Sequence, residues 1–384
     1  EILNIKDAYK HPLFYRGVDE ETGFKTSIVQ ISEDKLEWLS GIEIPPLQSL
    51  LANPNSFECI PRSIERDDET YLALMRMFYD LNLVQRWRIP HQTLARFILT
   101  VRRGYRSPAY HNWMHAFSVG HFVYACVNRL KLSENNFLTE LEVLALFVAA
   151  ICHDIDHRGT NNTFQIASKS VLAALYSSEG SVLERHHLSQ TICILNTNEC
   201  NIFTSLSAKD YERILDLIRD IILSTDLAHH LKIIHKQKQM IIDGYDRSDP
   251  DHHSLLLALL MTASDLSDQT KNWQNTTHVA KLIYEEFFGQ GDLEKSLGQE
   301  PTAGMDREKA CVPQLQISFL DFVIIPLYET LAKQFPQTRC FLATIHENRS
   351  RWNSILRNVQ KGKLNGSGLQ IFQYDLTNPA YFSE

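Results

Sequence analysis

The chain has 384 residues, 44% hydrophobic and 22% charged, a composition typical of a globular protein with a large core. Its net charge of −8, without a long basic run, argues against a nucleic-acid-binding surface. Seven scattered cysteines without a C-x-x-C pair fit a reducing cytoplasm, and the longest apolar stretch, residues 143–152, is about half of a bilayer span, so no transmembrane segment is expected.

The first residues differ from the rest of the chain. Residues 1–33 place turn residues between short β-prone runs, which predicts an irregular or hairpin-like segment, and they lack the apolar core of a signal peptide. From about residue 68, apolar positions recur at helical spacing. Leu72, Met75 and Phe78, for example, share one stripe. A helical domain is therefore expected to follow the N-terminal segment.

The remaining pattern is helical to about residue 360. Thr139 and Glu142 have the spacing of a capping box, which predicts the start of a buried helix. Gly289 and Gly291 are expected to close a later helix and to open a long loop over 289–313. Helices are predicted at 69–87, 91–104, 139–157, 207–241, 254–270 and 279–291. The fold class is therefore all-α, a compact multi-helix domain over 34–360 followed by a flexible tail over 361–384.

Two pairs of histidines indicate where chemistry could occur. His111 and His115 are four residues apart, as are His153 and His157, so each pair can share one helix face. Asp154 adds a carboxylate directly after His153. An acid that ends an apolar helix, Asp265, would be costly to bury without a positive partner. Borderline and hard divalent cations bind this mixture of imidazole and carboxylate.

A structural role for these histidines is the competing interpretation. The chain has 16 histidines, so some i,i+4 pairs arise by chance. Three adjacent pairs, at 186–187, 229–230 and 252–253, are expected at the surface, at helix caps or around a site. Two i,i+4 pairs together with a His-Asp step and a late acid form a much rarer set, typical of helical metal-dependent phosphohydrolases of the HD type. The residues favour a metal site but leave the substrate open.

Seven motifs carry a resemblance to a known family. YHNWMH, HDIDHRGTNN, SVLERHH, STDLAHH, DLSDQT, EEFFGQGD and LQISF occur in the order found in class I 3′,5′-cyclic nucleotide phosphodiesterases, over roughly residues 60–355. The sequences of residues 162–187 and 292–310 resemble those of the cGMP-stimulated, dual-specificity type 2 enzymes. The first 33 residues resemble a short part of a GAF domain. The resemblance thus implies a catalytic domain preceded by a GAF-like fragment or linker.

The resemblance implies the metal ligands. His115, His153, Asp154 and Asp265 match the residues that hold a tightly bound Zn²⁺, and Asp154 would also bridge to a second ion, Mg²⁺ or Mn²⁺. Three further residues match groups that hold metal-bound water, namely His157, Glu184 and Thr225. For Thr225, helix capping is the alternative role.

The resemblance also implies a mechanism. His111 matches the general acid that protonates the leaving 3′ oxygen while a metal-activated hydroxide attacks the cyclic phosphodiester. His111 must be cationic to act, and Glu184 is a candidate for the acid that supports its charge. The product would be a 5′-nucleoside monophosphate.

The family's purine pocket implies a further set of residues. Gln316 matches the glutamine that reads the purine edge, and its amide could serve adenine or guanine by turning over. Phe319 and Ile283 match the two sides of a clamp around the base, with Phe287 nearby. Asp268 stands where cAMP-selective members carry Asn, which argues against strict cAMP preference. Other matched pocket positions are Tyr110, Asn162 and Leu227, and Gly304 replaces a methionine of the similar enzymes.

Two other functions remain possible at this level. One is an HD-type hydrolase of another nucleotide or phosphomonoester, and the other is a cyclic nucleotide sensor whose catalytic site has decayed. The expected partners are cAMP and cGMP, with a homodimer possible. The expected location is the cytoplasm, with peripheral attachment to a membrane as the alternative.

Overall fold

The computed structural model describes residues 31–176 and 180–382 and is all-helical over that part of the chain, apart from one isolated β-bridge between Cys311 and Ser367. The predicted fold class is thereby confirmed. The expected hairpin-like segment lies outside the described residues, except for the start of the first described helix.

The first eight helices lead from the start of the described chain to the segment after the His-Asp motif. Their bounds are α2 Glu33–Gly41, α3 Asp67–Asp80, α4 Leu83–Arg86, α5 His91–Gly104, α6 Trp113–Arg129, α7 Glu140–Cys152, α8 Asn162–Ala167 and α9 Val171–Tyr176. The second eight are α10 Val182–Leu195, α11 Ala208–Leu223, α12 Leu227–Asp243, α13 Pro250–Asp265, α14 Trp273–Ser296, α15 Val312–Phe319, α16 Ile325–Gln334 and α17 Arg339–Gln360.

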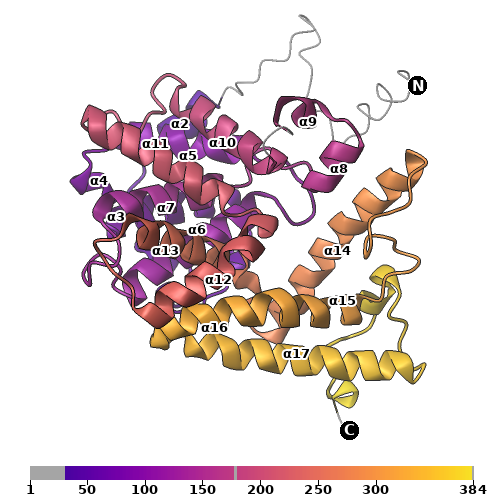
Figure 1. The fold of residues 1–384 in the computed structure, drawn as a ribbon. Coiled ribbons are helices and arrows are strands. Elements are labelled where there is room, and N and C mark those ends of the chain that lie inside the picture. Colours follow the sequence, from indigo (N-terminus) through magenta and orange to yellow (C-terminus); the bar gives the residue numbers. More distant parts are fainter. Residues whose placement is uncertain (1–30, 177–179, 383–384) are drawn as a thin grey trace, which may run out of the picture.

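Helix α7 lies at the centre of the core. The capping box predicted from Thr139 and Glu142 is present, since each side chain binds the other residue's backbone N–H. Every residue from Val143 to Cys152 is buried, as expected for a helix that is apolar on all sides. Helices α6, α11 and α13 pack around it (Figure 1). This packing drives the polar residues that follow α7 into the interior.

Helices α14 to α17 form the other side of the molecule (Figure 1). A π-helical turn, Leu320–Ile324, joins α15 to α16. It precedes Pro326, which has no N–H for a regular helical bond. By length and apolar composition alone, the run Val312–Gln334 could cross a membrane, but half of its most apolar window is buried and α15 packs against α17. This is the behaviour of a core helix.

Two boundaries differ from the sequence-based prediction. Helix α14 does not close at Gly291 but continues to Ser296. Gly291 instead leaves room for the Met305 backbone, which lies against the helix at this point. The C-terminal residues 361–382 also pack on the domain instead of forming a free tail. Ile371 is fully buried, and the indole N–H of Trp273 donates to the Leu376 carbonyl over 2.7 Å.

Candidate metal centre and adjoining pocket

Three chain segments bring the predicted metal ligands together. His115 lies in the first turn of α6, whose start is fixed by the Asn112 side chain accepting from the Met114 and His115 amides. His153 and Asp154 follow the buried end of α7. Asp265 is the last residue of α13. The core packing of these three helices therefore places four polar side chains at one point.

The four side chains meet within hydrogen-bonding distance. The Nε2 atoms of His115 and His153 are 3.3 Å apart, and Asp265 Oδ1 lies 3.0 Å from the first and 3.2 Å from the second. Asp154 Oδ2 lies 3.5 Å from His115 Nε2 and 3.3 Å from His153 Nε2. His115 and His153 are buried. The arrangement surrounds one small volume with two nitrogens and two carboxylate oxygens.

This geometry fits a divalent cation. His153 Nδ1 lies 2.9 Å from the Ala150 carbonyl and must donate to it, so a neutral His153 presents an unprotonated Nε2 to the cluster. Asp265 stands at a helix C-terminus, where the helix dipole disfavours negative charge. Burial opposes its ionisation, but the neighbouring histidines hold the pKa of Asp265 below its usual range. A cation at this point would satisfy the lone pairs and the two carboxylates together.

A second group of potential ligands adjoins the first. Asp154, His157 and His187 each offer a ligand atom, and these atoms lie within 4.8 Å of one another. His187 Nδ1 donates to the Ile155 carbonyl over 2.7 Å, which leaves its Nε2 facing Asp154 Oδ1 at 3.6 Å. Burial lowers the pKa of His157 to about 4 and that of His187 to about 3. Both rings are therefore neutral. His187 Nε2 can accept from water or bind a metal, whereas His157 Nδ1 accepts from the Gly159 amide over 3.1 Å, so its Nε2–H is a donor to water. His187 is buried, in contrast to the surface position considered for its pair.

His111 is held by a different acid from the one expected. Its Nδ1 donates to Glu286 Oε1 over 2.5 Å, while Glu286 Oε2 accepts from the backbone amides of Tyr110 and His111 over 2.9 and 3.1 Å. Burial disfavours the charged ring, but the Glu286 carboxylate and the two aspartates behind it outweigh burial and raise the pKa of His111 to about 9. The structure therefore favours a cationic His111 at neutral pH.

Glu184 contacts Asn162 and not His111. Its carboxylate accepts from the Asn162 amide over 2.9 Å, and burial raises its pKa to about 7. The expectation that it supports His111 is wrong, because Glu286 occupies that position. Asn162 accordingly contacts Glu184 and is not in the lining of the neighbouring pocket. The Thr225 hydroxyl donates to the Ile222 carbonyl at the end of α11, which is the capping alternative.

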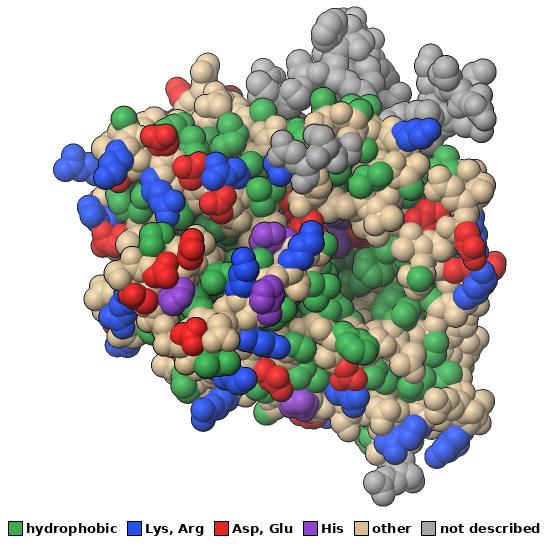
Figure 2. Space-filling model, viewed as in Figure 1, with side chains coloured by type: hydrophobic (Ala, Val, Ile, Leu, Met, Phe, Trp, Pro, Cys, Tyr) green, Lys and Arg blue, Asp and Glu red, His purple; other side chains and the backbone are tan. Residues whose placement is uncertain are grey.

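An apolar pocket of about 350 Å³ opens beside His111. Figure 2 shows histidines beside a hollow whose walls are mostly hydrophobic. Six of the predicted substrate-binding residues line it, namely Tyr110, Leu227, Ile283, Phe287, Gln316 and Phe319. Residues from α14, α15 and the loop between them complete the wall. The pocket is wide enough for a flat ring and adjoins the candidate metal centre through Tyr110, whose ring centroid is 4.7 Å from that of His115.

Gln316 is the polar group placed deepest in this wall. Its side chain is 2% exposed, and its Nε2 donates to the Tyr284 hydroxyl over 3.4 Å. Its Oε1 is buried without a hydrogen-bond partner among the described residues, as is Oε1 of Gln269, which also lines the pocket. Buried amide oxygens without partners are costly, so a ligand that donates hydrogen bonds would stabilise this wall.

Asp268 lies behind the pocket and not in its lining. Its carboxylate binds the buried guanidinium of Arg62 over 2.9 to 3.3 Å and accepts from the Tyr110 hydroxyl over 3.4 Å. Burial opposes ionisation, but Arg62 holds the pKa of Asp268 below its ordinary value. Any influence of this residue on a bound base must therefore pass through Tyr110 or the adjacent Gln269.

The fold and the two clusters define a helical protein with a candidate two-cation centre beside a ring-sized pocket. Residues 110–345, more than half of the chain, match the 3′5′-cyclic nucleotide phosphodiesterase family. The chain belongs to this family.

The relatives share the region that contains the site. The cGMP-specific 3′,5′-cyclic phosphodiesterases of Drosophila virilis, Drosophila melanogaster and Drosophila pseudoobscura pseudoobscura are each 42% identical to the chain over 299 residues, 77% of its length. These matches cover 33%, 26% and 27% of the respective relatives. The chain thus spans about a quarter to a third of the length of these proteins.

Sequence reasoning missed Glu286 and His187, although each left a signal. Glu286 lies four residues before the buried Gln290 and seven after the buried Val279, so it falls on the apolar face of its helix. A carboxylate there needs a partner. His187 follows Leu183 by one helical turn on α10, and both are buried.

Proposed function

We propose that this chain hydrolyses 3′,5′-cyclic nucleotides to 5′-nucleoside monophosphates. Membership of the family supports this, and one observation carries it to particular residues. A cluster of buried ligand atoms, two imidazole nitrogens and two carboxylate oxygens, lies beside a cationic histidine and a pocket with partnerless amide oxygens. The substrate has the matching parts, an anionic phosphodiester next to a flat base.

His115, His153, Asp154 and Asp265 would hold one divalent cation, for which Zn²⁺ suits the two imidazoles. Asp154 also belongs to the second group, where Mg²⁺ or Mn²⁺ would sit with water held by His157. When bound, such ions lower the pKa of coordinated water and offset negative charge on the phosphate. The proposed metals are testable by elemental analysis.

His111 is the proposed general acid. Its Nδ1–H is engaged by Glu286, so Nε2–H is the proton that can reach the leaving 3′ oxygen. The Glu286 carboxylate keeps the ring charged before proton transfer. The two backbone amides hold this carboxylate in place, and the carboxylate in turn orients the ring. Proton donation at this atom avoids the departure of a strongly basic alkoxide.

The base would lie between Ile283 and Phe319, with Gln316 at its edge. An amide presents one donor and one acceptor, and adenine and guanine offer complementary patterns to its two orientations. We therefore propose dual specificity of the type 2 kind, as the segments at 162–187 and 292–310 suggest. The Drosophila relatives are named cGMP-specific, so comparable kcat/KM on cAMP and cGMP would support the proposal and a strong bias to cGMP would contradict it.

The test is an assay of both cyclic nucleotides with purified protein, before and after removal of metal by a chelator. Turnover that disappears with the metal and returns with added Zn²⁺ and Mg²⁺ is the expected result. Turnover unaffected by complete metal removal would refute it. Nucleotide binding without turnover in the metal-loaded protein would support the decayed sensor instead.

Three finer points remain proposals. They are the GAF-like nature of residues 1–33, the start of the catalytic domain at residue 34, and a cytoplasmic location, and they follow from the resemblance and the composition alone. A homodimer is likewise proposed, and the mass of the protein in solution would test it.

A further inference from the structure

The wall of the pocket includes a loop segment that is built against α14. Ala303, Gly304 and Met305 line the cavity, yet they belong to the connection between α14 and α15. A connection of this length has many conformations, and a pocket wall requires one of them. Particular contacts must therefore fix the segment.

The closest contact is between two backbones. A Cβ atom at Gly291 would lie 1.9 Å from the Met305 carbonyl oxygen and 2.8 Å from its carbonyl carbon. Only glycine leaves room for this approach. A glycine within a helix costs roughly 1 kcal/mol relative to alanine, so its presence at a buried helix position calls for a packing reason. The Met305 backbone supplies that reason.

A buried carboxylate adds two hydrogen bonds one turn further along. Glu294 is 4% exposed, and it accepts from the Thr302 amide over 2.6 Å and from the Thr302 hydroxyl over 2.7 Å. Lys295 also binds Asp306 over 2.8 Å. The three contacts hold the segment 302–306 at its first residue and at its last two residues.

The same carboxylate is linked to the loop after the His-Asp motif. Gln290 donates to Glu294 over 2.9 Å and to the Asn161 side chain over 3.2 Å, and its Oε1 accepts from the Asn161 amide over 2.8 Å. Asn161 caps α8. The loop segment is therefore joined through α14 to the chain that carries His153 to His157.

We propose that Gly291 and Glu294 are positioning residues that fix segment 302–306 as a wall of the substrate pocket, a role that rests on the proposed function. The segment faces the base and not the metal centre. Its displacement should therefore weaken binding of ground state and transition state equally, which raises KM and leaves kcat nearly unchanged.

The test compares two alanine substitutions on one helix. Gly291→Ala places a methyl group against the Met305 carbonyl, whereas a Cβ at Gly289 meets nothing within 4 Å. Both changes have the same effect on helix propensity, so Gly289→Ala is the matched control. Glu294→Gln keeps the shape of the side chain and removes one of its two acceptor oxygens. Kinetics on cAMP and cGMP are combined with amide hydrogen exchange of residues 302–305.

We expect Gly291→Ala to raise KM about 10- to 100-fold for both substrates, with kcat within about threefold and faster exchange at 302–305. Glu294→Gln should act in the same direction, and Gly289→Ala should change neither quantity. The proposal would be overturned if KM stayed unchanged while exchange at 302–305 became faster. It would also be overturned if kcat fell equally in all three variants. If the wild-type protein turns over neither nucleotide, the proposed function is refuted. The positioning role is tested separately in that case, because unaltered exchange at 302–305 in Gly291→Ala would refute it.

Discussion

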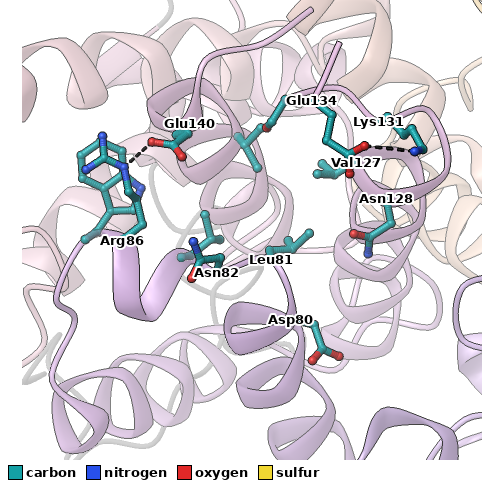
Figure 3. Close-up of a pocket in the computed structure, with 13 residues that line it drawn as sticks. Asp80, Leu81, Asn82, Arg86, Val127, Asn128, Lys131, Glu134 and Glu140 are labelled. Carbon is teal, nitrogen blue, oxygen red and sulfur yellow. Dashed lines mark hydrogen bonds and ion pairs between the residues drawn. The ribbon is translucent and has the colours of Figure 1, made fainter. Parts of the chain in front are cut away.

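Two hollows in this protein differ in how their charges are satisfied. Beside His111, buried imidazoles and carboxylates face one another and two amide oxygens lack partners. The second hollow, about 250 Å³ between the ends of α3, α6 and the start of α7, is lined by charges that pair with one another (Figure 3). There Arg86 binds Glu140 and Lys131 binds Glu134, with every side chain at least half exposed.

The difference shows what identifies a functional site here. Exposed ion pairs contribute about 0–1 kcal/mol and require no ligand. Buried groups that face each other without compensation are costly, and a bound cation or substrate removes that cost. The hollow beside His111 holds buried ionisable groups, whereas the two ion pairs of the hollow in Figure 3 are exposed and involve no buried charge.

Removing a ligand of the candidate cation should have the largest effect. Asp265→Asn keeps the shape of the side chain but removes the negative charge that faces both histidines. We expect the metal to be lost on dialysis and turnover to fall to background, because metal ligation requires the ionised carboxylate. Elemental analysis alongside the assay checks both results. Full occupancy by tightly bound metal would contradict the ligand role.

The next largest effect is expected at the general acid. His111→Ala should slow turnover by ~10²–10⁴-fold while leaving the metal content unchanged. The separation of the two readouts distinguishes proton donation from metal binding. Turnover equal to that of the wild type would eliminate His111 as the acid.

The pH profile tests the pairing of His111 with Glu286. The pKa of His111 is raised to about 9, so the cationic form dominates below that pH and is lost as the pH rises through it. Glu286→Gln removes the charge that favours the cation while burial remains. The alkaline limb of kcat/KM should move down by roughly 2 pH units or more. Glu184→Gln, made in parallel, should leave the limb in place because Glu184 contacts Asn162.

A smaller effect is expected in the apolar pocket. Phe319→Ala removes a ring from the lining next to Gln316. Stacking of a base on an aromatic ring contributes ~1–3 kcal/mol, so KM should rise roughly 5- to 150-fold. Measured kcat should change little, since Phe319 belongs to the pocket proposed for the base and not to the candidate metal ligands. An equal change in kcat and none in KM would place the ring outside the binding site.

The hollow of Figure 3 supplies the smallest expected effect. Arg86→Ala breaks the pair with Glu140 and the stacking of the guanidinium on Trp87, 4.8 Å from the ring centroid. At such exposure the loss of unfolding free energy should be about 1 kcal/mol. Kinetic constants should stay within about twofold of the wild type. A large kinetic change would show that the two hollows are coupled.

Much of the fold could be predicted because helical periodicity and capping are local properties. The run at 143–152 is apolar on all sides, and it became the central helix. The end of α14 could not be predicted, because Gly291 is explained by Met305, 14 residues away in the loop. The packing of residues 361–382 could not be predicted either, because it also depends on a contact between distant residues. A polar, glycine-rich sequence does not indicate that Trp273 donates a hydrogen bond to Leu376.

The candidate site shows the same division between local and distant information. Residue type and spacing indicated the two histidine pairs with Asp154 and Asp265. The resemblance then implied that His115, His153, Asp154 and Asp265 are the ligands, and these four do meet. The acid beside His111 comes from a helix about 175 residues later, and only the tertiary fold could select Glu286 over Glu184.

Helix α14 contributes residues to three parts of the site. Ile283 and Phe287 shape the pocket, Glu286 holds His111, and Gly291 with Glu294 receives the opposite wall. The proposed base recognition and the proposed proton donation therefore both depend on this one helix. Substitution of the pocket side chains on α14 can change the preference for a nucleotide without moving the general acid. A bend in the helix would displace both the pocket wall and His111.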